Sequence, residues 1–120
     1  MSDGATPYLT PEASARVNID KMLNLAGWVV QDRNDINLYE GQGVAVREYL
    51  LKGGSEADYL LFVDRKAVGV LEAKKEGDTL TGVEHQSAKY ADGLPDDLDA
   101  PVKPLPFLYE STGIVTVQAP

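Results

Sequence analysis

The chain lacks cysteine and has a single histidine, His85, among its 120 residues. Without thiols, disulfide frameworks, thiol nucleophiles and cysteine-rich zinc sites are excluded. One imidazole is also too few for the usual structural zinc site, so a metal bound here must be a hard cation with oxygen ligands. Magnesium, calcium and manganese are the candidates.

Long apolar runs and positive charge are also scarce. No stretch approaches the ~18 apolar residues of a membrane span, and the N-terminal residues lack the basic and apolar regions of a signal peptide. The cytoplasm is therefore the expected location. The 11 Lys and Arg residues are outnumbered by 19 Asp and Glu, and the net charge of −8 repels phosphate at long range. This balance argues against autonomous nucleic-acid binding and leaves room only for a local DNA contact.

The overall composition of the chain is that of one folded domain. Hydrophobic residues make up 43% of the chain and charged residues 25%, as in ordinary soluble globular proteins. A chain of this length buries one modest core. We expect residues 1–9 to form a flexible arm and residues 10–120 to form a single domain.

Local patterns predict an α/β domain. Thr10, Pro11 and Glu12 supply an N-cap, a first-turn proline and an acidic residue at the positive end of a helix dipole. Strands are indicated by alternating or apolar runs, and a second helix by a capping box at residues 81–84. The predicted helices cover 11–26 and 78–91, and the predicted loops cover 31–43 and 95–106. A short apolar run at 28–30 could begin a strand, and further strands are predicted at 44–51, 57–63 and 67–74. Residues 107–110 and 114–117 are either two short strands or one strand interrupted at 111–113.

The connection between the strands at 57–63 and 67–74 decides which charged side chains share a face of the sheet. A two-residue loop at 65–66 would place Asp58 and Glu72 on opposite faces. A three-residue loop at 64–66 pairs Asp58 with Glu72 instead. Tight primed turns favour Asn or Gly, and neither occurs at 65–66. This favours the longer loop or an equivalent bulge, and period-two geometry then adds Lys74 to the same face.

The convergence of Asp58, Glu72 and Lys74 suggests metal-assisted chemistry. Two carboxylates a few ångströms apart repel each other, and a divalent cation bound between them relieves the repulsion. Magnesium binds through one or two protein carboxylates plus a substrate phosphate, so Asp58 and Glu72 are candidate ligands. Lys74 could orient a bound water or stabilise negative charge on a phosphoryl oxygen. The pattern predicts hydrolysis of a phosphodiester.

These residues also carry a family resemblance. Ala57-Asp58, followed after 13 residues by Glu72-Ala73-Lys74, resembles the bipartite signature of the PD-(D/E)xK nuclease superfamily, with Ala57 in the place of the signature proline. Residues 44–48, 57–64, 70–74 and 86–90 together resemble the N-terminal nuclease domain of the restriction (R) subunit of type I restriction-modification enzymes. The similarity runs from about Thr10 to Gly113.

The resemblance implies a restriction-endonuclease-like core, a mixed central sheet flanked by helices in the order α-β-β-β-α-β. It implies that Asp58 and Glu72 bind Mg²⁺ and that Lys74 serves catalysis. Gln86 and Tyr90, on the second predicted helix, would support cleavage near the DNA. The implied function is a magnesium-dependent DNA endonuclease domain of a type I restriction enzyme.

The resemblance also implies partners. They are double-stranded DNA, bound weakly by this domain alone, and the modification and specificity subunits of a restriction complex. Family members continue into an ATP-driven motor, and this sequence has no Walker-type phosphate loop. We therefore expect the chain to be a fragment of a larger motor-containing subunit, with ATP used only by the motor.

Two other hypotheses remain open. A non-catalytic docking module for partner subunits would keep the fold without the metal chemistry. A small α+β binding domain would place Asp58 and Glu72 on opposite faces of the sheet. Fold alone does not choose among these functions. Gln86 and Tyr90 taken alone are equally compatible with a helix face that bonds to nearby backbone.

Overall fold

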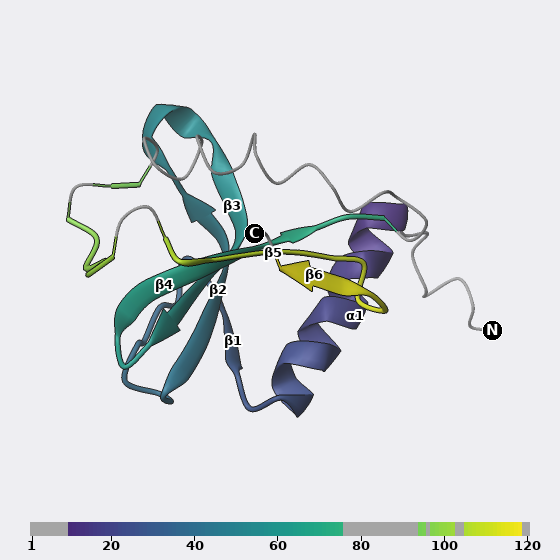
Figure 1. Cartoon of the computed structure of the whole chain (residues 1–120), viewed down its shortest axis with the longest axis horizontal. Helices are drawn as coiled ribbons and strands as arrows, with labels where there is room; N and C mark the ends of the chain where they lie inside the picture. The colour runs from purple at the N-terminus through teal and green to yellow at the C-terminus, as the bar shows by residue number, and fades with distance from the viewer. Residues whose placement is uncertain (1–9, 76–93, 96, 103–104, 119–120) are drawn as a thin grey trace.

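The computed structural model describes residues 10–75, 94–95, 97–102 and 105–118. Within these residues the chain forms one α-helix, a short 3-10 turn and a six-stranded mixed sheet in the order β1-β2-β3-β4-β5-β6 (Figure 1). This confirms the predicted α/β class, whereas the second predicted helix, 78–91, lies outside the described residues. The elements are α1 (Pro11–Leu25), β1 (Val29–Asp32), β2 (Gly43–Leu50), η2 (Lys52–Gly54), β3 (Glu56–Val63), β4 (Lys66–Ala73), β5 (Phe107–Ser111) and β6 (Thr116–Gln118).

Helix α1 begins where the N-cap pattern predicts. The side chain of Thr10 accepts a hydrogen bond from the backbone N–H of Ala13 at 3.1 Å, which satisfies one of the free donors of the first turn. The helix ends at Leu25, one residue before the predicted end. On its inner face, Ile19 is completely buried and Leu23 is almost completely buried against the sheet. No helix in the described part of the chain is long and apolar enough to cross a membrane.

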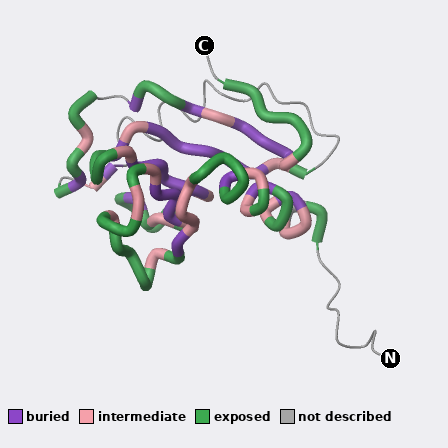
Figure 2. Tube along the Cα trace, turned by 90° about the horizontal axis from the view of Figure 1, so that it is seen from below, coloured by how far each residue is buried: buried purple, intermediate pink, exposed green. Residues whose placement is uncertain are grey.

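The strands pair antiparallel from β2 through β4 and again between β5 and β6, while β1 pairs parallel with β2 and β5 parallel with β4. Each face of the sheet buries its own apolar cluster, and Figure 2 shows the buried positions running along the strands. Central strands covered on both faces are expected to be mainly apolar, as the middle parts of β3 and β4 are. The cluster under α1 contains Ile19, Leu23, Ala45, Tyr59, Leu61, Leu71 and Ala73, and the opposite cluster includes Val44, Val46, Leu60, Phe62, Val70 and Leu108.

The connection from β3 to β4 reaches the expected register by a different route. The turn is a tight two-residue one at 64–65, and both residues have positive φ, 50° and 71°. The preference for a longer loop, based on the lack of Asn and Gly, is therefore wrong. A β-bulge after Leu61 then shifts the register by one residue, so that Tyr59 pairs with Leu71. This is the register that the equivalent-bulge alternative predicts.

Two strand boundaries differ from the predictions by more than one residue. Strand β1 continues through Gln31 and Asp32, which were assigned to a loop, because Asp32 pairs with Arg47 both in register and by a 2.9 Å ion pair. Strand β6 begins at Thr116 and not at residue 114. The preceding residues form a turn in which the Thr112 hydroxyl accepts hydrogen bonds from two backbone N–H groups, those of residues 114 and 115.

Candidate functional site

Asp58 links three elements of the fold at the end of β3. Its Oδ2 accepts the backbone N–H of Ala73 on β4 at 2.8 Å, and its Oδ1 accepts a hydrogen bond from Arg16 Nη2 on α1 at 2.5 Å. The side chain is only 18% exposed. Asp58 on β3 is thus held beside the backbone of Ala73, the residue that follows Glu72 on β4.

Arg16 supplies the positive charge nearest to Asp58. Burial lowers the pKa of the Arg16 guanidinium, but the charge and hydrogen bond of Asp58, with a smaller contribution from Glu48 at 3.9 Å, outweigh burial and raise this pKa above its ordinary value. Arg16 is therefore always charged here. Glu48 itself has a positive φ of 53°. It lies on β2 between two residues that pair with β3, namely Arg47, which pairs with Tyr59, and Tyr49, which pairs with Ala57.

A polar network fixes α1 over this end of the sheet. The buried Tyr59 hydroxyl donates to Asp20 Oδ1 at 2.7 Å, and Arg47 Nη1 pairs with Asp20 Oδ2 at 2.8 Å. Burial, followed by the hydrogen bond to Asp20, raises the pKa of the Tyr59 phenol well above its ordinary value. The phenol therefore stays protonated and keeps donating. Because α1 carries Arg16, this network also fixes the guanidinium next to Asp58.

Glu72 and Lys74 lie at the C-terminal end of β4, where Glu72 pairs with Glu110 in the parallel register of β4 and β5. Aligned residues of neighbouring strands point to the same face of a sheet, and so do residues two apart on one strand. Glu72 is 7% exposed and Glu110 is 1% exposed. Lys74 Nζ lies 4.0 Å from Glu110 Oε2. Two carboxylates and one ammonium thus gather at this end of the sheet.

The predicted site residues therefore fall into three groups according to their place in the structure. Glu72 and Lys74 are brought together with Glu110, and Asp58 is tied to the adjoining amide of Ala73 and to Arg16. Gln86 and Tyr90 lie outside the described residues. Among the residues that the structure describes, no three His, Cys, Asp or Glu side chains are grouped so that they could hold a metal ion.

Sequence reasoning did not single out Glu110 or Arg16. Glu110 stands in a short apolar strand, where a fully buried acid is unusual, and that mismatch is the signal that could have identified it. Arg16 gives no such signal, because a polar residue on a helix is ordinary and its pairing with Asp58 joins residues far apart in sequence.

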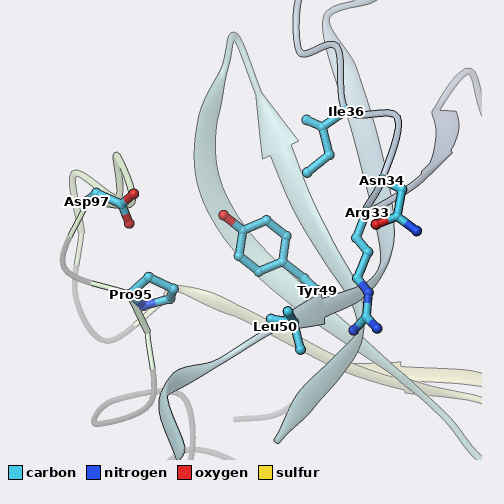
Figure 3. A pocket seen from close by; sticks show the side chains of 7 residues that line it. All are labelled: Arg33, Asn34, Ile36, Tyr49, Leu50, Pro95 and Asp97. Atoms are coloured by element: carbon cyan, nitrogen blue, oxygen red, sulfur yellow. The ribbon is translucent and has the colours of Figure 1, made fainter. Parts of the chain in front are cut away.

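The pocket shown in Figure 3 lies elsewhere, beside β1 and β2. Tyr49 lines this pocket, and burial together with the charge of Asp97 raises the pKa of its phenol, which is therefore neutral. The pocket contains none of the predicted site residues, and its lining comprises Arg33, Asn34, Ile36, Tyr49, Leu50, Pro95 and Asp97.

An α/β domain with a mixed sheet, and with acidic and basic side chains gathered at the ends of β3, β4 and β5, is compatible with a nuclease-like fold. The comparisons with known proteins narrow this class. The family described as "Type I restriction enzyme EcoKI endonuclease subunit second domain" matches residues 33–106, more than half of the chain. The chain therefore belongs to this family of type I restriction enzyme endonuclease-subunit domains, as its sequence resemblance predicted. Neither a curated protein nor a solved structure gives a match.

Proposed function

We propose that this domain is the magnesium-dependent DNA endonuclease unit of a type I restriction enzyme. It would hydrolyse phosphodiester bonds of DNA delivered by an ATP-driven translocating complex. One observation carries the proposal: the hydrogen bond from Ala73 N–H to Asp58 Oδ2, which holds Asp58 beside the strand that bears Glu72 and Lys74. Family membership supports the same activity in the parent enzyme.

The specific fold proposed is the restriction-endonuclease-like core. Support comes from helix α1 and the antiparallel series β2-β3-β4, which correspond to the first four elements of the expected order if β1, which lies between α1 and β2, is set aside. The parallel pairing of β5 with β4 is the mixed-sheet arrangement expected after a crossover connection. These features support the core, whose second helix would lie in residues 78–91.

The donor chemistry at this site fits Mg²⁺, which prefers hard carboxylate oxygens and needs only one or two of them from a protein. Asp58 and Glu72 would hold the ion. When bound, Mg²⁺ would neutralise phosphate charge and lower the pKa of a coordinated water. Lys74 would stabilise negative charge on a phosphoryl oxygen through its ammonium. Arg16 already neutralises Asp58 Oδ1, so the guanidinium would compete with a cation there.

The net negative charge of the domain limits its own affinity for DNA. A net charge of −8 opposes the approach of a polyanion, so affinity for DNA in isolation would be weak. We propose that the modification and specificity subunits, together with the motor of the parent subunit, bring double-stranded DNA to the site. This division of labour fits a domain that contributes chemistry and relies on its partners for affinity.

The test is a Mg²⁺ titration of the 120-residue chain, followed by NMR amide shifts and by calorimetry. The wild-type chain is expected to show saturable shifts centred on residues 58 and 72–74. Glu72→Gln and Asp58→Asn each remove a ligand charge and should weaken binding by about tenfold or more. Glu40→Gln, an exposed loop position, is the matched control and should bind as wild type does.

The same titration separates this function from the docking-module hypothesis. A docking module would give either no response to Mg²⁺ or weak shifts that Glu72→Gln leaves unchanged. Either result would contradict the proposed endonuclease function.

Arg16→Gln is expected to increase Mg²⁺ affinity. The substitution removes a competing positive charge from Asp58, and the partly exposed position of the pair keeps the gain to roughly 2- to 5-fold. Calorimetric titration measures it, with Arg33→Gln as the control, since Arg33 pairs with Glu56 and not with Asp58. Unchanged or weaker binding in Arg16→Gln would show that Asp58 Oδ1 takes no part in holding the cation.

A further inference from the structure

Glu110 is the most deeply buried charged side chain among the described residues, with 1% of its surface exposed. Removing a carboxylate from water is costly unless a nearby charge or hydrogen bonds compensate. In the part of the chain that the structure describes, neither carboxylate oxygen of Glu110 makes a hydrogen bond. Its one ion-pair contact there is with Lys74 Nζ, at 4.0 Å.

The backbone of Lys74 is fixed by pairing with β5, whereas its side chain is long and flexible. Its N–H donates to the carbonyl of Ser111 at 2.8 Å, which extends the pairing of β4 with β5 by one residue. The side chain is 36% exposed, and a lysine stem has four rotatable bonds that would let the ammonium turn into solvent. A fixed negative charge on β5 counteracts this tendency.

The register explains where that negative charge places the ammonium. Glu110 is aligned with Glu72, so an ammonium drawn toward Glu110 is drawn back along the strands from the level of Lys74 to the level of Glu72. Without this attraction, Lys74 would share a face with Glu72 but would not be held near it.

We propose that Glu110 is a positioning residue for Lys74: its buried carboxylate holds the ammonium beside Glu72. This inference rests on the proposed function for its catalytic meaning. The contact between the Glu110 carboxylate and the Lys74 ammonium does not itself depend on that function. In this role Glu110 would act through Lys74 and would contact neither the metal ion nor the DNA.

The direct test measures the motion of the Lys74 side chain by NMR relaxation of the lysine ε-methylene groups in the full 120-residue chain. In the wild type, the Lys74 methylene should have a higher order parameter than that of the exposed Lys66. In Glu110→Gln, which keeps shape and removes charge, it should fall to the Lys66 value. Glu56→Gln removes the surface partner of Arg33 and should leave Lys74 unchanged. An unchanged Lys74 order parameter in Glu110→Gln overturns the proposal.

Glu110→Asp is the second variant, and it keeps the inference testable if Glu110→Gln does not fold. It retains the charge on a side chain shorter by one methylene, so Lys74 should keep an order parameter above that of Lys66. A merely structural role for Glu110 predicts no such dependence on charge. An Asp variant with a fully mobile Lys74 in a folded domain would overturn the proposal.

A Mg²⁺ titration of Glu110→Gln separates this inference from the proposed function. Positioning predicts a smaller loss of Mg²⁺ affinity in Glu110→Gln than in Glu72→Gln, because Asp58 and Glu72 both remain as ligands. A loss of binding as large as that in Glu72→Gln would make Glu110 a ligand and overturn the positioning role. If the wild-type chain fails to bind Mg²⁺, the proposed function fails, while the Lys74 order parameters still decide the role of Glu110.

Discussion

Lys74→Gln is expected to lower the rate of DNA cleavage by the assembled restriction enzyme by roughly 100-fold or more. The ammonium would stabilise charge that develops on the phosphate only during reaction, and glutamine offers a dipole in place of that charge. Mg²⁺ binding to the domain should persist, because Lys74 is not a ligand. Single-turnover cleavage and the Mg²⁺ titration, run on the same variant, measure the two effects.

Lys75→Gln is the matched control for this prediction. Lys75 is the next residue along the chain and is exposed, so losing its charge changes the net charge equally without changing the ammonium near Glu110. Its cleavage rate should stay within about twofold of wild type. Equal losses in Lys74→Gln and Lys75→Gln would mean that general attraction for DNA, and not a placed catalytic group, accounts for the effect.

Gly69→Ala is expected to lower the free energy of unfolding by about 3 kcal/mol, because the new methyl would overlap a neighbouring strand. A Cβ at this position would lie 2.5 Å from the backbone oxygen of Phe107 and 2.8 Å from its Cβ. Backbone cannot move aside as a flexible side chain can. The two residues are register partners at the start of the β4 and β5 pairing, so relief of the overlap requires the strands to separate.

Urea unfolding measures the loss, and Gly54→Ala provides the comparison. Gly54 has a φ of 87° with open space around the missing Cβ, so alanine there suffers backbone strain without overlap. Strain alone costs about 1 kcal/mol. Gly69→Ala should therefore unfold at a clearly lower urea concentration. If the two variants lose equal stability, strands β4 and β5 do not approach as closely at Gly69 as described.

Much of the fold could be predicted from the sequence because its signals are local. The cap at Thr10 and the apolar alternation place α1, β2, β3 and β4 within about one residue of their observed ends. The register of β3 with β4 is the one that the equivalent-bulge alternative predicts, although the preference for a longer loop was wrong. The tight turn at 64–65 was not predictable, because Asp and Arg adopt positive φ there without the usual Asn or Gly.

The contacts of the site were harder to predict because they join distant residues. The shared face of Glu72 and Lys74 follows from the two-residue periodicity of a strand, which Lys74 continues by pairing with Ser111 just after β4 ends. The pairing of Arg16 with Asp58 depends on how α1 crosses the sheet, and the alignment of Glu110 with Glu72 depends on which strand β5 joins. No local pattern encodes either choice. Gln86 and Tyr90 stay predictions from the resemblance.

The alignment of residue 72 with residue 110 has a consequence for folding kinetics. Strands β2, β3 and β4 are successive neighbours joined by short connections, so their contacts can form early, whereas β5 must return across a long stretch of chain before it pairs. A nascent chain that has made only the first hairpins already presents Asp58, Glu72 and Lys74 but has no Glu110 beside them. Asp58, Glu72 and Lys74 can therefore be aligned before β5 joins the sheet, and Lys74 gains the carboxylate of Glu110 only when β5 pairs with β4.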